Sequence, residues 1–216
     1  MYEYQGWWFP DNEDHFPKMM KKSTDKGGPA EYQYQVRDRS LKYVKQRGIA
    51  LDIGANVGLW SRSLCASFRT VIAFEPVAMF RECLMRNVPA GNLQVKDFAL
   101  GDQRTTALMI ITEGNTGHTH NNPASIGQGD TEVYRLDDLE LDIVDYIKMD
   151  CEGYEYRILQ GAEQTIRRCR PVVVVEQKPH DAYSNQYGQH AAIELLKSWG
   201  MVRLDQVKDD WIMGWP

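Results

Sequence analysis

The sequence lacks several features that mark specialised classes of protein. No apolar run approaches the roughly 20 residues that a membrane-spanning helix needs, and the first residues contain no apolar core of a signal peptide. We therefore expect a cytoplasmic protein with no membrane partner. Acidic residues outnumber basic ones by 30 to 25, and this net charge of −5 argues against a surface that binds nucleic acid.

Cysteine is also scarce, and its spacing argues against a zinc site. The cysteines lie far apart in the sequence and none forms a Cys-x-x-Cys pair; they are Cys65, Cys83, Cys151 and Cys169. Reduced thiols are the simplest expectation for a cytosolic protein. We expect no metal site.

What the sequence does contain is an alternation of strand and helix patterns over 216 residues, which is enough for one α/β domain with a substantial core. We expect this domain to span residues 31–216 and an aromatic-rich N-terminal arm to span residues 1–30. In the arm, Trp7 and Trp8 lie beside glycine and proline, a pattern that predicts irregular structure rather than a helix. Because such large side chains need burial, we expect the arm to pack on the domain or on a partner.

The periodicity of apolar residues predicts the elements of the domain. Helices are expected over residues 31–47, 60–68, 77–87, 151–168 and 191–199. Strands are expected over residues 49–53, 70–75, 93–95, 107–111, 131–136, 144–150, 171–176, 201–204 and 211–213. Residues 107–136 are expected to form a hairpin-like insertion at the sheet edge.

The stretch of residues 50–61 organises the rest of the prediction. An apolar run that reaches Asp52 predicts a buried strand, and a helical pattern follows. Gly54 and Gly58 lie between them and allow a sharp turn in which the backbone approaches a ligand closely. The spacing is neither the Gly-x-Gly-x-x-Gly dinucleotide fingerprint nor a phosphate loop. With Asn56, it resembles Asp-x-Gly-x-Asn-x-Gly, the first motif of S-adenosylmethionine (SAM) methyltransferases, although any tight strand-to-helix turn shares part of this pattern.

Glu75 ends the next apolar strand and is followed by Pro76, about 20 residues beyond the glycine turn. A carboxylate offers two acceptor oxygens, which suit the vicinal hydroxyls of a ribose. A solvated strand end would account for Glu75 by itself. The combination with the glycine turn at this distance favours a cofactor site.

The third strand leads to Asp97, Phe98 and Ala99. In a doubly wound sheet the carboxyl ends of the first three strands face one crevice, so these residues can reach the adenine of a cofactor. Asp97 would accept from the exocyclic amine, and Phe98 or Ala99 would contact the ring. A turn-capping role for Asp97 is equally compatible with the sequence.

Residues 112–130 are rich in glycine, asparagine, threonine and serine, and they contain His118 and His120. This is long for a connection without secondary structure, and such loops are often lids or binding loops. The His-x-His pattern suggests a metal, but no third ligand lies nearby. We expect a mobile substrate loop without a metal.

Two further strand ends carry acids. Asp150 ends the predicted central strand and is followed by Glu152 and Glu155 at a helix start, where the helix dipole stabilises carboxylates. Glu176 ends the next strand. In the structural interpretation, these carboxylates only cap the helix. In the functional interpretation, Asp150 lies beside the cofactor and the acceptor. Asp150 and Glu176 would also suit a divalent cation, but no third oxygen ligand is identifiable.

Together these segments resemble the FkbM family of methyltransferases. The resemblance covers residues 49–176 and is carried by residues 51–58, 74–76, 99–102, 136–139 and 147–155. The Ile-Lys-x-Asp-x-Glu-Gly-x-Glu run is its most specific part. The resemblance implies a Rossmann-like SAM-dependent methyltransferase fold, with a mostly parallel central sheet and helices on both faces. It also implies methylation of an oxygen, often a sugar or polyketide hydroxyl.

We therefore predict a SAM-dependent methyltransferase that acts on a hydroxyl of a sugar, a glycan or a small molecule, in a chain compatible with a homo-oligomer. Cofactor contacts are predicted for Asp52, Gly54, Asn56, Gly58, Glu75, Pro76, Asp97, Phe98, Ala99 and Asp150. Methyl transfer needs mainly positioning, and a hydroxyl acceptor also needs a base. Asp150, Glu152 and Glu176 are the predicted catalytic residues, with the loop histidines as further candidates.

Two other function classes stay open. One is N-methylation of a protein or nucleic acid, although no Asn/Asp-Pro-Pro-Tyr/Phe motif is present for amino methylation of bases. The other is a non-catalytic SAM-fold binding protein. The intact glycine turn with Glu75 argues against this second class.

Overall fold

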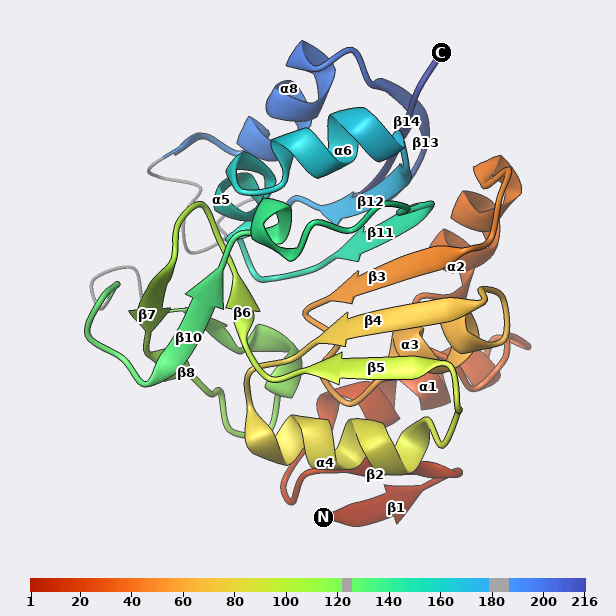
Figure 1. Ribbon diagram of the computed structural model, residues 1–216. Coiled ribbons are helices and arrows are strands. Elements are labelled where there is room, and N and C mark those ends of the chain that lie inside the picture. Colours follow the sequence, from red (N-terminus) through yellow and green to blue (C-terminus); the bar gives the residue numbers. More distant parts are fainter. Residues whose placement is uncertain (122–125, 179–186) are drawn as a thin grey trace.

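A seven-stranded sheet forms the centre of the computed structural model, which describes residues 1–121, 126–178 and 187–216 (Figure 1). The strand order is β13-β14-β12-β11-β3-β4-β5. The strands are β3 Ile49–Ile53, β4 Thr70–Phe74, β5 Leu93–Lys96, β11 Tyr146–Met149, β12 Val172–Glu176, β13 Val202–Val207 and β14 Asp210–Gly214. Five neighbours from β12 to β5 run parallel, and β14 and β13 complete one edge in antiparallel pairing. The predicted α/β fold is confirmed.

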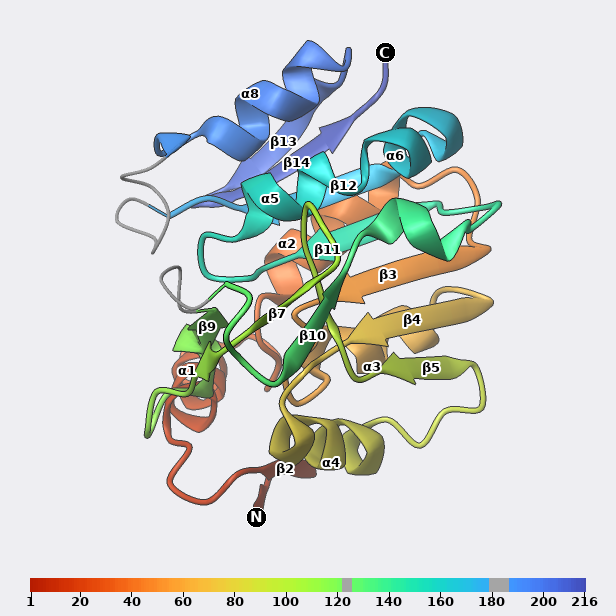
Figure 2. The ribbon, with the colours of Figure 1, turned by 60° about the vertical axis from the view of Figure 1, so that its left-hand side comes forward.

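Helices cover both faces of this sheet (Figures 1 and 2). One layer comprises α5 Glu155–Gln160, α6 Glu163–Cys169 and α8 Ala191–Ser198, and the other comprises α2 Tyr34–Ser40, α3 Leu59–Cys65 and α4 Ala78–Asn87. Successive side chains of a strand point to opposite faces, so β3 serves both layers. Leu51 and Ile53 enter the core under α5, α6 and α8, whereas Ala50 enters the core under α2 and α3. Burial on both faces accounts for the continuous apolar runs of the parallel strands.

Two of the expected helices differ clearly from their patterns. The helix expected over residues 31–47 ends at Ser40 and continues only as the 3-10 turn η1 Leu41–Tyr43. The helix expected over residues 151–168 begins at Glu155 and is interrupted at Gly161 between α5 and α6. At Gly161 the chain packs directly on other backbone, since an added Cβ would lie 1.9 Å from the Gly101 carbonyl oxygen. Tertiary contact therefore breaks a pattern that looks continuous in the sequence.

The insertion after the third strand forms two small sheets. The first, in the order β6-β10-β7, comprises β6 Ala99–Leu100, β7 Thr105–Ala107 and β10 Thr131–Tyr134. The antiparallel pairing of Ala107 with Thr131 confirms a hairpin-like insertion. The second sheet pairs β8 Met109–Ile110 with β9 His120–Asn121. The single strand expected over residues 107–111 is therefore wrong, because its two halves pair with different partners.

The N-terminal arm is more ordered than its sequence suggests, and the prediction of irregular structure is wrong. It contains a hairpin of β1 Tyr2–Tyr4 and β2 Trp7–Phe9, followed by helix α1 His15–Thr24. Both residues of the two-residue turn between the strands, Gln5 and Gly6, have positive φ, which matches the twist of a tight hairpin. The hairpin lies beside α4 near the N-terminus of the chain (Figure 1).

The arm packs on the domain through a separate core. This core contains Trp7, Phe9, Phe16 and Met20 from the arm, together with Val57, Leu59 and Cys83 from the domain. Asn87, at the end of α4, holds the arm in both directions: it accepts the Trp8 N–H at 2.6 Å and donates to the Trp8 carbonyl at 2.9 Å. The same amide donates to the Val57 carbonyl at 2.8 Å. The arm is thus joined to the glycine turn as well as to α4.

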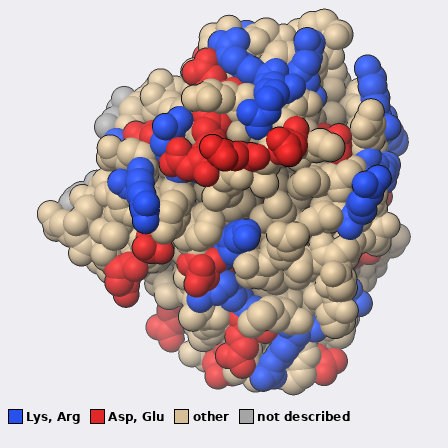
Figure 3. Space-filling view, in the orientation of Figure 1, with Lys and Arg blue, Asp and Glu red and all other residues tan. Residues whose placement is uncertain are grey.

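Two features of the structure can be compared with the composition: the distribution of charge on the surface and the length of the helices. On the face drawn in Figure 3, acidic and basic side chains are interspersed, and the basic ones do not form one continuous surface. None of the helices in the described residues has the length and apolar character that crossing a membrane requires.

Candidate functional site

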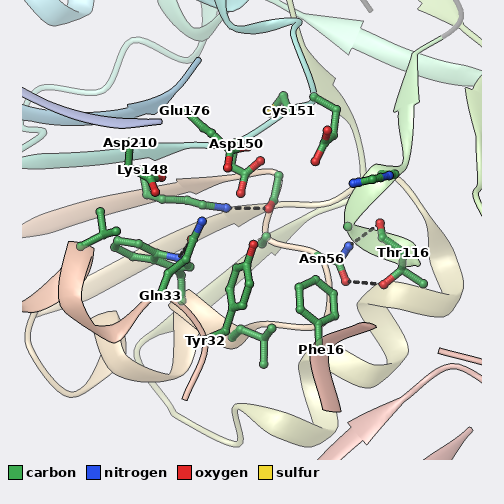
Figure 4. Close-up of a pocket in the computed structure, with 18 of the residues that line it drawn as sticks. Phe16, Tyr32, Gln33, Asn56, Thr116, Lys148, Asp150, Cys151, Glu176 and Asp210 are labelled. Atoms are coloured by element: carbon green, nitrogen blue, oxygen red, sulfur yellow. Dashed lines mark hydrogen bonds between the residues drawn. The ribbon is translucent and has the colours of Figure 1, made fainter. Parts of the chain in front are cut away.

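A cavity of about 680 Å³ lies at the carboxyl ends of the parallel strands. This volume is typical of a small-molecule site. One wall is formed by the glycine turn and the ends of β4, β11 and β12, and the opposite wall by α1 and the residues that follow it. Figure 4 shows Lys148, Asp150, Glu176 and Asp210 on the first side, and Phe16 and Tyr32 on the second.

The glycine turn presents backbone to the cavity through Gly54, Ala55 and Asn56. Gly54 has a φ of 74°, and an added Cβ would lie 2.2 Å from the Asp150 carbonyl oxygen, so a side chain would collide with the end of β11. The N–H groups of Gly54 and Ala55 both donate to the Phe74 carbonyl at 3.1 Å. The Lys148 ammonium donates to the Gly54 carbonyl at 2.9 Å. These bonds fix the turn from two neighbouring strands.

Two residues of the first motif support the turn from behind and do not line the cavity. Asp52 is fully buried; it accepts the Ser61 hydroxyl at 2.6 Å and lies 3.5 Å from the Lys148 ammonium. Gly58 has a φ of 88° at the start of α3, and an added Cβ would lie 3.0 Å from a methyl of Val88. Their contribution to the site is therefore indirect, through Lys148 and through packing on α4.

Burial opposes the charge of Lys148, but the neighbouring carboxylates of Asp52 and Asp150 hold the pKa of Lys148 above its usual value. Lys148 therefore stays a cation. It links the first motif to the end of β11.

Each carboxylate oxygen of Glu75 accepts one backbone hydrogen bond. Its Oε2 accepts the Asn56 N–H and its Oε1 accepts the Val77 N–H, each at 2.8 Å. A carboxylate has about four acceptor positions, so each oxygen retains one for a ligand hydroxyl. Burial raises the pKa of Glu75 to about 7, against the lowering effect of these two bonds. Glu75 and Pro76 line the cavity, and this donor set fits a ribose diol.

The predicted adenine contacts are only partly brought to the cavity. Ala99 lines it, together with Leu100. Asp97 is exposed and lies outside the lining. Phe98 packs between Phe74 and Tyr134, with ring centroids 5.8 and 4.6 Å away, and also lies outside it. The chain leaves β5 at Lys96 and crosses directly into β6, and this crossing turns Asp97 and Phe98 away from the cavity.

The acids of the two central strand ends form a cluster. Oxygens of Asp150, Glu152 and Glu176 lie within 4.8 Å of one another. Glu152 is the third oxygen ligand that the sequence did not identify. The Lys178 ammonium lies 3.0 Å from Glu152 and also forms an ion pair with Glu176. A lysine therefore supplies positive charge where a cation would be held.

Asp150 and Glu176 interact directly, and their pKa values are shifted in opposite directions. Burial and the charge of Asp150 raise the pKa of Glu176 far above its usual value. Burial also opposes the charge of Asp150, but Lys148 and Lys178 hold the pKa of Asp150 below its usual value. Within the pair, a proton is therefore held more readily by Glu176 than by Asp150. Burial and the charge of Asp150 raise the pKa of the adjacent Asp210 to about 7.

Glu155, another acid of this motif, stabilises the turn between β11 and α5. Glu155 is buried and accepts the N–H groups of Cys151 at 2.7 Å and Gly153 at 3.3 Å. Glu152 takes a left-handed conformation, with a φ of 52°, which costs energy for a residue with a side chain. This conformation directs the Glu152 side chain to Lys178 and the cluster. The conformation of the turn after β11 therefore places the Glu152 side chain at the cavity and not at the start of α5.

The arm and the residues directly after it contribute residues that sequence reasoning missed. Tyr32 faces the acidic cluster, and burial together with the charges of Asp150 and Glu176 raises the pKa of Tyr32 (Figure 4). Phe16 packs edge-on against Tyr32 with ring centroids 4.9 Å apart. His15 also lines the cavity and lies 6.3 Å from the His118 ring. No local motif marks these residues, since their place depends on the docking of the arm.

The loop expected to be structureless is ordered over much of its described part. It contains the 3-10 turn η2 Thr116–His118 and strand β9, and Thr116 is buried. His118 and His120 both line the cavity. Residues 122–125 lie outside the described residues. Mobility of this segment stays a prediction.

The chain is similar to known methyltransferases. A model of the methyltransferase FkbM domain family matches residues 52–202. A methyltransferase FkbM from Methylobacillus flagellatus KT aligns with a TM-score of 0.51 and 18% identity, over 77% of this chain but only 43% of that one. Precorrin-8w decarboxylase from Methanobacterium thermoautotrophicum aligns with a TM-score of 0.50 and 12% identity, over 99% of each chain. At such identities the likeness shows the fold alone. No curated protein matches the chain.

Proposed function

The chain belongs to the methyltransferase FkbM domain family, and from this premise we propose that it is a SAM-dependent methyltransferase acting on a hydroxyl of a sugar, a glycan or another small molecule. One observation carries the proposal. The cavity contains both a buried carboxylate suited to a ribose, Glu75, and an ionised carboxylate suited to a hydroxyl acceptor, Asp150. A cytoplasmic location, homo-oligomerisation and the division between residues 1–30 and 31–216 stay predictions.

The glycine turn, Glu75 and Ala99 fit SAM. Glu75 accepts from the ribose hydroxyls with the acceptor positions that Asn56 and Val77 leave open. The backbone of Gly54 and Ala55 admits the amino-acid end of the cofactor, and the small Ala99 side chain borders the adenine. When bound, SAM supplies an electrophilic methyl group on a sulfonium.

The acidic cluster supports the acceptor side of the reaction. Asp150 accepts a hydrogen bond from the acceptor hydroxyl and thereby orients its oxygen. As that oxygen forms its new bond to carbon, its O–H becomes strongly acidic, so even a carboxylate of low pKa takes the proton. Glu176, whose pKa is raised, hydrogen-bonds to Asp150 and holds its orientation. Removal of the proton leaves a neutral ether on the acceptor.

The low pKa of Asp150 favours oxygen over nitrogen as the methylated atom. An aliphatic amine arrives protonated and must lose a proton before it can attack. A carboxylate with a lowered pKa is a poor base for that early step. A hydroxyl attacks as a neutral group and releases its proton only as the new bond forms.

Two measurements test this function. Calorimetry should show that the protein binds S-adenosylhomocysteine. Incubation with methyl-labelled SAM and a panel of glycans and small alcohols, followed by mass spectrometry, should then place the label on an oxygen. Label on nitrogen would replace the proposal with N-methylation. Binding without transfer to any acceptor in the panel or in a cell extract would favour the non-catalytic alternative.

A further inference from the structure

Glu13 is a buried carboxylate in the N-terminal arm. It lies 39 residues before residue 52, where the match to the family model begins. It lies between β2 and α1, and only 2% of it is exposed. Its Oε1 accepts the Phe16 N–H at 3.0 Å, and its Oε2 accepts the Thr116 N–H at 2.6 Å. A buried carboxylate is costly without such donors. The second donor, however, comes from the insertion 103 residues away.

Thr116 continues this connection to the glycine turn. Its carbonyl accepts from the Asn56 amide group at 2.9 Å, and its hydroxyl donates to the Asn56 Oδ1 at 3.3 Å (Figure 4). Asn56 has a φ of 50°, a left-handed conformation that asparagine tolerates when its side chain bonds locally. Its Oδ1 also accepts the Val57 N–H at 2.8 Å. Thr116 therefore holds the side chain that stabilises this conformation.

Asn56 in turn holds the ribose carboxylate. In its left-handed conformation, Asn56 directs its N–H to the Glu75 Oε2 at 2.8 Å. The result is one continuous series of hydrogen bonds from Glu13 through Thr116 and Asn56 to Glu75. Its interior links are all between buried or half-buried groups, where hydrogen bonds are little weakened by water.

We propose that Glu13 is a positioning residue of the cofactor site. It fixes Thr116, and through Thr116 it maintains the conformation of Asn56 that orients Glu75 toward the ribose. This inference rests on the proposed function, since it takes Glu75 as the ribose contact. Because coupling between sites is reciprocal, cofactor on Glu75 also stabilises the docking of the arm.

A purely structural role for Glu13 makes a different prediction. In that case Glu13 only caps α1 through the Phe16 N–H, and its loss lowers stability without changing the ligand site. The two roles are separated by comparing Glu13→Ala with Tyr2→Phe. The Tyr2 hydroxyl donates to the backbone carbonyl of Glu13, so its removal weakens the same arm but leaves the carboxylate in place.

The experiment uses the full chain with two measurements. Hydrogen exchange in the free protein follows the Asn56 amide relative to the Leu51 amide of the β3 core, which corrects for global unfolding. Calorimetry measures the Kd of S-adenosylhomocysteine. Glu13→Ala should speed exchange at Asn56 and raise the Kd about three- to tenfold, the size of effect expected for residues that act through a network. Tyr2→Phe should leave both quantities unchanged.

A double variant tests whether the effect passes through Glu75. In a Glu75→Ala background, Glu13→Ala should raise the Kd by much less than it does alone. Glu13→Gln, which keeps the shape and one acceptor oxygen, should give a smaller effect and provides a second variant if Glu13→Ala folds poorly.

The outcomes distinguish this inference from the function on which it rests. Equal affinities of the wild-type protein and both Glu13 variants, or full additivity with Glu75→Ala, would overturn the positioning role alone. Failure of the wild-type protein to bind S-adenosylhomocysteine would overturn the proposed function together with this inference.

Discussion

The cavity contains two sets of residues that are built in different ways, and these sets differ from the two sides described above. We call the residues assigned to the cofactor the cofactor wall and those assigned to the acceptor the acceptor wall. The cofactor wall comes mainly from residues 54–76, with Ala99 beside them, and uses mainly backbone groups and one carboxylate. The wall assigned to the acceptor is assembled from side chains that lie far apart in the sequence, among them Tyr32, His118, Asp150 and Glu176. A site of the first kind can be conserved as a motif, whereas a site of the second kind varies with the segments that surround it.

The difference extends to electrostatics. The cofactor wall has one buried acid whose charge is supported by two backbone N–H groups. The acceptor wall has several acids and two lysines that shift one another's proton affinity. Changes on the cofactor wall should therefore alter binding, and changes on the acceptor wall should alter turnover. The predictions below test this division.

The largest effect is expected on the acceptor wall. Asp150→Asn keeps the shape but removes the base, so turnover should fall by about two to four orders of magnitude. Glu152→Gln should lower turnover less, because its partner Lys178 also pairs with Glu176. Turnover is measured with labelled SAM and the acceptor that the panel identifies. Asp97→Asn, at an exposed acid outside the cavity, is the matched control.

Normal turnover of both variants would place the base elsewhere, at Glu176 or among the loop histidines. A large loss of S-adenosylhomocysteine affinity in Asp150→Asn would contradict the division between the two walls.

The next effect is expected on the cofactor wall. Glu75→Ala should weaken S-adenosylhomocysteine binding by about 1.5–3 kcal/mol, the range for hydrogen bonds to a charged group. Asp97→Ala should leave the affinity unchanged, since Asp97 does not line the cavity. Calorimetry on both variants shows which of the two acids, Glu75 or Asp97, contributes to binding. A loss of affinity in Asp97→Ala instead would restore its predicted adenine contact.

A smaller effect is expected from pH, because burial raises the pKa of Glu75 from 4.5 to about 7. Between these values the folded protein binds more protons at Glu75 than the unfolded chain does, so this group lowers the stability of the free protein as pH rises. The ribose is bound by the ionised carboxylate. Affinity for S-adenosylhomocysteine should therefore rise with pH through about 7, and fall by about tenfold for each unit well below it.

Glu75→Gln should remove this pH dependence. Asp210 titrates in the same range, since burial raises its pKa to about 7, so Asp210→Asn serves as the control that keeps Glu75 ionisable. A pH dependence that survives in Glu75→Gln but disappears in Asp210→Asn would assign it to the acceptor wall.

The smallest effect is expected at Tyr32, which directly follows the arm and faces the cluster. Tyr32→Phe removes one neutral hydrogen-bonding group, which is worth about 0.5–1.5 kcal/mol. The change should appear in kcat/KM for the acceptor and not in the affinity for S-adenosylhomocysteine. Equal kinetics of Tyr32→Phe and the wild-type protein would show that the Tyr32 hydroxyl does not contact the acceptor.

The sequence by itself determined the fold class, because a parallel sheet buried on both faces requires continuous apolar strands such as those around Val174 and Leu51. It also determined the glycine turn and Glu75, since both belong to one strand–turn–helix unit and its neighbouring strand. Asp150 and Glu176 were predicted to lie at one crevice for a similar reason: adjacent parallel strands end at the same edge.

Only the tertiary structure decided the rest of the site. The sequence could not show that Asp97 turns away, that Glu155 rather than Glu152 stabilises the turn after β11, or that Lys178 joins the acids. It also could not show that an arm with an irregular pattern forms a hairpin and a helix that place His15 and Phe16 in the cavity, next to Tyr32. Local periodicity records which side chains are buried in an element. It does not record which distant segments pack together, and that packing places the acceptor wall.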